Sequence, residues 1–187
     1  LRALDFEIFL DLKYHDIPNT VANACRVAAD LDVWMLNVHA AGGRNMMEAA
    51  YESLRKSRSS KNPPLLIAVT LLTSISSNDL LELGITKSVE DQVLLLSKLE
   101  KSSGLDGVVC SGIEVSKLRH ELGKDFCLVT PGIRLDDLNS DDQKRIMSPH
   151  DAIKAGSNYL VIGRPITGAS NPTDILKSIN KSISSLD

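Results

Sequence analysis

The chain is organised around one stretch, residues 9–20, which reads FLDLKYHDIPNT. A mostly apolar run at residues 6–10 leads into it and predicts a strand that is buried on most of one face. Asp11 and Lys13 follow two residues apart. Because the side chains of a strand alternate, both should project from the same face. With Asp16 just beyond, three charges gather at one strand end, which makes this the first place to look for chemistry.

These charges have two interpretations. If their shared face points into a closed barrel or a sheet crevice, the Lys13 ammonium is costly there unless carboxylates compensate it, and Asp11 and Asp16 are the nearest candidates. The other interpretation is a solvated loop with a weak surface ion pair, which is the commoner outcome for such a group of charges. The residues taken alone favour the solvated loop.

Composition excludes several classes of protein. The 187 residues fit one domain, and 43% hydrophobic with 24% charged residues is ordinary for a globular protein. A net charge of -3 gives no general attraction to nucleic acid or to an anionic membrane. No signal peptide or membrane-spanning apolar stretch is visible. Cys25, Cys110 and Cys127 have no metal-ligand spacing, which predicts reduced, buried thiols in a cytoplasmic protein.

Strand-like and helix-like segments alternate along the chain. After the opening strand, further strands are predicted at residues 33–39, 65–70, 107–110, 126–130 and 159–163. Helices are predicted at residues 19–31, 44–56, 88–104, 114–122, 148–155 and 172–184, with a possible short helix in 71–86 and an irregular segment at 135–146. This alternation predicts a parallel sheet, either an open Rossmann-like sheet or a closed barrel. No glycine-rich dinucleotide fingerprint follows a strand, which weakens the first option.

The sequence predicts fewer strands than a closed barrel of this kind contains. Such a barrel has eight strands in typically about 250 residues, whereas about six strands are predicted here. The first residue is Leu1 and not Met, and the simplest resolution is that two leading strand-helix units are absent from this chain. The predicted fold is therefore an α/β TIM (β/α)8 barrel. Residues 1–187 are expected to supply about six of its units as a single, N-terminally incomplete domain.

The pattern Asp-x-Lys-x-x-Asp-Ile-Pro-x-Thr at residues 11–20 resembles the signature of the bacterial orotidine 5'-phosphate decarboxylase family. The first Asp, Lys and second Asp alone would indicate only the wider suprafamily, and the Ile17-Pro18-x-Thr20 continuation makes the resemblance more specific. A second match, Ile-Gly-Arg-Pro at residues 162–165, follows the last predicted strand, where barrels often bind phosphate. The family carries its Asp-x-Lys pair on the third strand, which agrees with two absent units. An Asp and a Lys from its earlier strands have no match here.

The resemblance implies decarboxylation of orotidine 5'-monophosphate to UMP in de novo pyrimidine biosynthesis, without metal or organic cofactor. Lys13 would be the cation beside C6 and then the proton donor, with Asp11 and Asp16 keeping it charged and oriented. All three would also contact substrate. Arg164 and the Gly163 N–H would hold the phosphate. The other implied substrate-binding residues are Leu12, Tyr14, His15, Ile17, Pro18, Asn19, Thr20, Thr73, Arg134 and Gln143.

The resemblance also implies a homodimer, because Asp16 and Thr20 of this family reach into the neighbouring subunit's site. No nucleic-acid or membrane partner is expected. Asn37 and His39 end the second predicted strand, and we interpret His39 as a packed structural residue.

Two alternatives stay open. A sister enzyme of the suprafamily, which decarboxylates a keto-sugar phosphate with a magnesium ion, would share Asp11, Lys13 and Asp16. The Ile-Pro-x-Thr continuation and the loop that carries Arg134 and Gln143 argue against it. A non-catalytic phosphoribosyl-binding barrel, or an inactive fragment, belongs to a different class, and the unmatched early strands keep it open.

Overall fold

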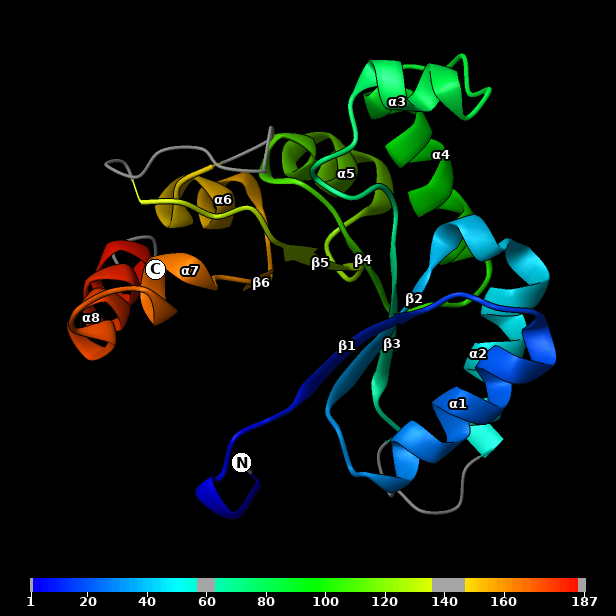
Figure 1. Ribbon diagram of the computed structural model, residues 1–187, viewed down its shortest axis with the longest axis horizontal. Helices are drawn as coiled ribbons and strands as arrows, with labels where there is room; N and C mark the ends of the chain where they lie inside the picture. Colours follow the sequence, from blue (N-terminus) through cyan, green and yellow to red (C-terminus); the bar gives the residue numbers. More distant parts are fainter. Residues whose placement is uncertain (1, 57–62, 136–146, 185–187) are drawn as a thin grey trace. The chain divides into compact units, whose positions relative to one another are not determined.

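The computed structural model describes residues 2–56, 63–135 and 147–184 (Figure 1). The strands are β1 (Phe9–Tyr14), β2 (Met35–His39), β3 (Leu65–Val69), β4 (Gly107–Val109), β5 (Cys127–Thr130) and β6 (Tyr159–Leu160). Their order in the sheet follows the chain, β1-β2-β3-β4-β5-β6. Pairing is parallel between β1 and β2, β2 and β3, and β5 and β6. The predicted strands in chain order are therefore confirmed. By contact, the chain divides into two compact units, residues 1–70 with 94–108 and residues 71–93 with 109–187.

The first unit places helices α1 (Pro18–Asp30) and α2 (Arg44–Lys56) against each other (Figure 1). Short 3-10 turns are η1 (Arg2–Leu4) and η2 (Ala40–Gly42), and the unit also takes in most of α4 (Val89–Ser102). The small side chains of Ala28 and Ala29 in α1 are buried, which allows close packing of this helix. Four consecutive residues of β2 are buried, as in a parallel strand that is covered on both faces.

The second unit holds α3 (Ser77–Glu82), η3 (Gly112–Glu114), α5 (Val115–Leu122), α6 (Pro149–Ala155), α7 (Arg164–Thr167) and α8 (Pro172–Ile183). Side chains fix where several of these helices begin. Ser76 and Asp79 form a reciprocal capping box at α3, and Ser148 accepts the Asp151 N–H at α6. Asn171 caps α8 in the same way. These caps supply acceptors for N–H groups that have no partner within the helix.

Two strands and one helix differ most from the sequence prediction. β1 begins at Phe9, three residues later than the predicted apolar run, and it contains Asp11 and Lys13, as the alternation argument assumed. β6 is only Tyr159–Leu160, and the four-residue helix α7 was not predicted. The predicted helix at 44–56 is confirmed at both ends, and the possible short helix in 71–86 is α3. Most of the predicted irregular segment lies outside the described residues.

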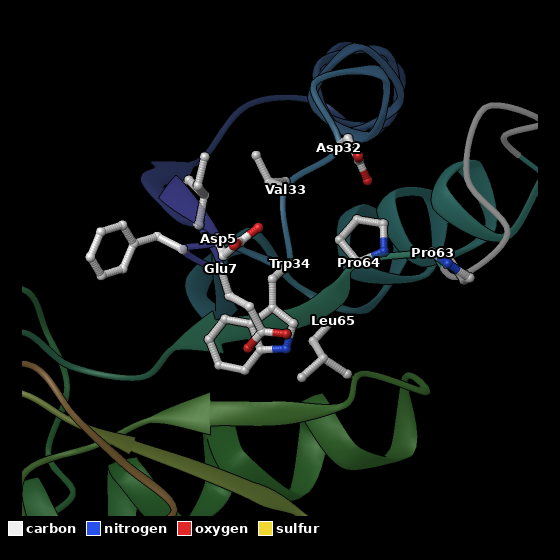
Figure 2. Close-up of a pocket in the computed structure, with 10 residues that line it drawn as sticks. Asp5, Glu7, Asp32, Val33, Trp34, Pro63, Pro64 and Leu65 are labelled. Atoms are coloured by element: carbon white, nitrogen blue, oxygen red, sulfur yellow. The ribbon is translucent and has the colours of Figure 1, made fainter. Parts of the chain in front are cut away.

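A pocket of about 520 Å³ lies at the amino ends of β1, β2 and β3 (Figure 2). Asp5, Glu7, Asp32 and Trp34 are among its lining residues. Asp11 and Lys13 lie further along β1, toward its carboxyl end. Barrel enzymes build their sites at the carboxyl ends of the strands, so this pocket is on the wrong side for catalysis.

Two remaining predictions concern the burial of the cysteines and the presence of a membrane-spanning helix. Cys25 and Cys110 are buried as predicted, whereas Cys127 is half-buried, and none of the three is in a disulfide. Burial raises the pKa of the Cys25 thiol to about 12. Among the residues that the structure describes, no helix is long and apolar enough to cross a membrane.

Candidate active site

A bulge in β1 shapes the candidate site. Leu10 pairs with Leu36 and Tyr14 pairs with Val38, so residues 11–13 lie opposite the single residue Asn37. Within the bulge Lys13 has φ of 52°, in the left-handed region. That conformation costs a residue with a Cβ about 1–2 kcal/mol, so the surroundings must hold it. Asp11 and Lys13 do meet on one side, but through this bulge and not through regular strand alternation.

Three side chains form a hydrogen-bonded cluster at the bulge. The Lys13 Nζ lies 2.6 Å from Asp11 Oδ1, and Asn37 Nδ2 donates to the same oxygen at 2.6 Å. The Lys13 backbone N–H donates to Asn37 Oδ1 at 2.8 Å. The Lys13 and Asp11 side chains are 36% and 40% exposed, whereas Asn37 is 1% exposed. An ion pair this open contributes at most about 1 kcal/mol to stability.

Two histidines border the cluster. The rings of His15 and His39 have centroids 5.5 Å apart and are tilted by 37°. Burial lowers the pKa of His39, and the nearby His15 and Lys13 lower it further, while Asp11 acts in the opposite direction. The lowered pKa favours the neutral form of His39. The sequence suggests a structural role for His39, and this stays a prediction, since the structure shows only that His39 lies near Lys13 and His15.

The rest of the signature forms the turn into α1. The Asp16 carboxylate accepts the Ile17 N–H at 2.6 Å, and Pro18 occupies the first turn of the helix, where a missing N–H costs nothing. The Thr20 N–H donates to the Ile17 carbonyl at 3.0 Å. Asp16, Ile17 and Thr20 are all exposed. Their side chains are thus available to another molecule.

The remaining predicted site residues of the first unit lie in or next to this turn. Leu12 is 55% exposed, and His15 and Asn19 are exposed as well. Tyr14 is half-buried against α1, and burial followed by the nearby Cys25 raises the pKa of its hydroxyl.

The other predicted site residues belong to the second unit. Gly163 precedes α7, whose first residue is Arg164. A side chain at Gly163 would meet no atom of the described residues within 4 Å, so the space above its backbone is open. The Arg134 N–H donates to the Met147 carbonyl at 3.0 Å, and Thr73 is half-exposed in the turn before α3. Gln143 lies outside the described residues.

Sequence reasoning missed the role of Asn37. The signal was present, because an amide within the otherwise apolar strand VWMLNV at residues 33–38 must find partners when it is buried. The partners themselves could not be foreseen, since they depend on the bulge. Among the described residues, no group of three or more His, Cys, Asp or Glu side chains is arranged to hold a metal ion.

Comparison with known proteins gives one consistent family. The profile of the Orotidine 5'-phosphate decarboxylase / HUMPS family matches residues 1–179. The orotidine 5'-phosphate decarboxylase of Hydrogenovibrio crunogenus is 61% identical over 178 residues, covering 95% of this chain and 74% of that protein. The Neisseria meningitidis serogroup C enzyme of the same name is 59% identical over 94% of this chain and 71% of its own. The crystal structure of orotidine 5'-phosphate decarboxylase from Lactobacillus acidophilus matches with a TM-score of 0.85 and 42% identity, over 97% of this chain and 77% of that one.

Proposed function

The chain belongs to the orotidine 5'-phosphate decarboxylase / HUMPS family, and we propose that it decarboxylates orotidine 5'-monophosphate to UMP in pyrimidine biosynthesis. The predicted fold class, a TIM barrel of which about six strand-helix units are present, is confirmed by the strand order and by the likeness to the Lactobacillus acidophilus structure. The name of the family profile also includes HUMPS proteins. Both relatives at about 60% identity are named orotidine 5'-phosphate decarboxylase, which favours that activity. The keto-sugar-phosphate alternative is therefore set aside.

The chemistry falls to Lys13. When the bond between C6 and the carboxylate breaks, carbon dioxide leaves and the electron pair stays on C6 as a vinylic carbanion that the ring delocalises poorly. A fixed cation beside C6 stabilises that charge as it develops, and the same ammonium then delivers a proton to C6 to give UMP. This proposal is supported by the 2.6 Å contact with Asp11, which orients the Lys13 ammonium. No metal or organic cofactor is needed in this scheme.

Other residues bind the parts of the substrate that do not react. We assign the phosphate to Arg164 and the Gly163 N–H, and contacts with the rest of the nucleotide to Thr73, Arg134 and Gln143. Arg164 offers a planar fork that matches phosphate oxygens. Binding energy from the phosphate is then available to organise the site around the reacting carbon. We further propose that Asp11 crowds the departing carboxylate, which raises the energy of the bound substrate relative to the transition state.

The assembly is also a proposal. Asp16 and Thr20 are exposed beside Ile17, whose side chain is 68% exposed. A second subunit that covers this turn would bury Ile17 and receive Asp16 and Thr20 at its own site. Residues 1–187 would then serve as one barrel domain of a homodimer. Thiols without a disulfide are consistent with the reducing cytoplasm, where we place the reaction.

The Lys13→Ala variant of the full-length protein tests the assignment. It removes the cation and the proton donor together, so turnover should fall by more than the ~10²–10⁴-fold that general acid catalysis contributes, as followed by the loss of substrate absorbance. The circular dichroism spectrum should not change. Lys56→Ala is the matched control, because it breaks an exposed ion pair with Glu52 in the same unit. Turnover of Lys13→Ala within a few fold of wild type would refute the role of Lys13.

A further inference from the structure

Asn37 is a buried polar side chain that binds both charged residues of the cluster. It is 1% exposed and lies on β2, where its neighbour on the far side is Ile67 of β3. We propose that Asn37 is a positioning residue for the decarboxylation, setting the orientation of Asp11 and the backbone conformation of Lys13. This inference rests on the proposed function of Lys13.

The backbone argument starts from the bulge. Three residues of β1 face Asn37 alone, which interrupts the regular ladder of backbone hydrogen bonds between the two strands. The Asn37 side-chain carbonyl accepts the Lys13 N–H at 2.8 Å, so it provides an acceptor where the ladder is interrupted. Lys13 is held there at φ of 52°. Asn37 therefore selects the conformation that turns the Lys13 side chain toward Asp11.

The side-chain argument concerns the amide nitrogen. Asp11 Oδ1 receives both the Lys13 ammonium and Asn37 Nδ2, each at 2.6 Å. The second donor fixes the rotation of the carboxylate, because an oxygen with two donors in fixed places cannot turn without losing one of them. An amide is suited to both hydrogen bonds at position 37. It presents an acceptor to the Lys13 N–H and a donor to Asp11, whereas a carboxylate would set a second negative oxygen against Asp11.

Two substitutions separate the positioning role from simple packing. Asn37→Leu has a similar volume and removes both hydrogen bonds. Misplacement of a reacting group by about 1 Å can cost roughly 10²-fold in rate, so we expect a fall of that order in kcat. The KM should change little, because the phosphate contacts assigned to Arg164 are untouched. Ser157→Ala is the control. Ser157 is buried in the second unit, and its hydroxyl bonds with Thr130, so the variant loses a buried hydrogen bond that involves none of the cluster residues.

Asn37→Asp keeps the shape and adds a pH readout. At acidic pH the introduced carboxyl is protonated and can donate to Asp11 as the amide does. As it ionises, two carboxylates face each other beside Lys13, His39 and His15, and the cluster rearranges. The kcat of Asn37→Asp relative to wild type should therefore fall as the pH rises. A merely structural role would not move the pH profile. If Asn37→Leu fails to fold, Asn37→Asp still tests the proposal.

A crystal structure of Asn37→Leu or Asn37→Asp at neutral pH gives a readout that does not depend on activity. We expect Lys13 to leave the left-handed region and its ammonium to lose the contact with Asp11. The positioning role is overturned if Lys13 keeps both its left-handed conformation and its contact with Asp11. It is also overturned if the kcat and pH profile of the Asn37 variants match those of Ser157→Ala. A wild-type protein that does not turn over orotidine 5'-monophosphate would instead overturn the proposed function, and the crystal structure would still decide the role of Asn37.

Discussion

Lys13 combines features that a residue selected only for stability would not have. Its backbone is left-handed although it carries a side chain, and its ion pair with Asp11 is more than a third exposed on each side. Natural proteins break local rules mostly at functional sites. The sequence revealed the three charges and their closeness to a strand end. It did not reveal the bulge, because alternation along a strand assumes an unbroken ladder, and only the partner strand decides where that ladder breaks.

Glu100 of α4 departs from the rule that a buried charged side chain has hydrogen-bond partners. Its side chain is fully buried in the first unit, and neither carboxylate oxygen has a hydrogen-bond partner of good geometry among the described residues. Burial raises the pKa of the Glu100 carboxyl well above its ordinary value, and the nearby Ala68 backbone offsets this only in part. The folded state therefore holds a proton that the unfolded state releases more easily.

This gives a testable dependence of stability on pH. Between the ordinary pKa of a glutamate and the raised pKa in the fold, the folded state binds more protons than the unfolded state, so stability falls as pH rises. Glu100→Gln keeps the shape and cannot ionise. Its advantage in Tm over wild type should grow from pH 5 to pH 8, and each unit of pKa difference adds about 1.4 kcal/mol. Thermal melts at several pH values measure it. If the difference in Tm between the two proteins is the same at every pH, Glu100 ionises without a cost in stability.

At the scale of elements, the predictions succeeded where local signals agree. The helix α2 matches its predicted bounds because an apolar periodic run follows a glycine pair and ends in basic residues. The helix α7 was missed because Gly163-Arg164-Pro165 is typical of a turn, and four residues are too few to show a helical period. The short β6 was overestimated for a related reason, since the apolar run continues past the last paired residue.

One arginine joins several elements of the second unit. The Arg119 guanidinium on α5 donates to four backbone carbonyls and one side-chain amide at 2.6–3.1 Å, those of Gly123, Lys124, Phe126, Gly156 and Asn158. The Gly123 carbonyl lies just past the end of α5 and the Gly156 carbonyl just past the end of α6. Arg119 thus satisfies acceptors that the helix ends leave without partners.

Arg119→Met keeps the apolar stem and removes all of these donors. We expect the free energy of unfolding to fall by about 2–4 kcal/mol in urea titrations, since several carbonyls lose a charged donor at once. Lys117→Met on the same helix is the matched control. It breaks an exposed pair with Glu90, and its effect should be much smaller. Equal losses for the two variants would mean that water replaces the Arg119 contacts without penalty.

At the scale of the molecule, strict alternation of strands and helices was enough to predict the parallel sheet in chain order and to favour the barrel. The resemblance then narrowed the barrel to one family, which the relatives confirm. Alternation cannot tell which residues serve another subunit, because a pattern along one chain holds no information about a second copy. The assembly therefore has to be tested on mixed proteins.

Two inactive variants should restore activity to each other if the proposed dimer is correct. Lys13→Ala and Asp16→Ala are each expected to be inactive in a homodimer with shared sites. In a mixed dimer, one site lacks both residues, and the other combines Lys13 of one chain with Asp16 of its partner. Random mixing makes half of the dimers mixed, so about a quarter of all sites should be intact.

The measurement is turnover after the two variants are unfolded and refolded together, with distinct tags to confirm that mixed dimers form. Lys13→Ala mixed with Asp11→Ala is the control. Asp11 and Lys13 contact each other within one chain, so every site in that mixture has lost one of the pair and no activity should return. If the first mixture stays as inactive as the control although mixed dimers are present, Asp16 serves its own chain's site and the shared-site dimer is wrong.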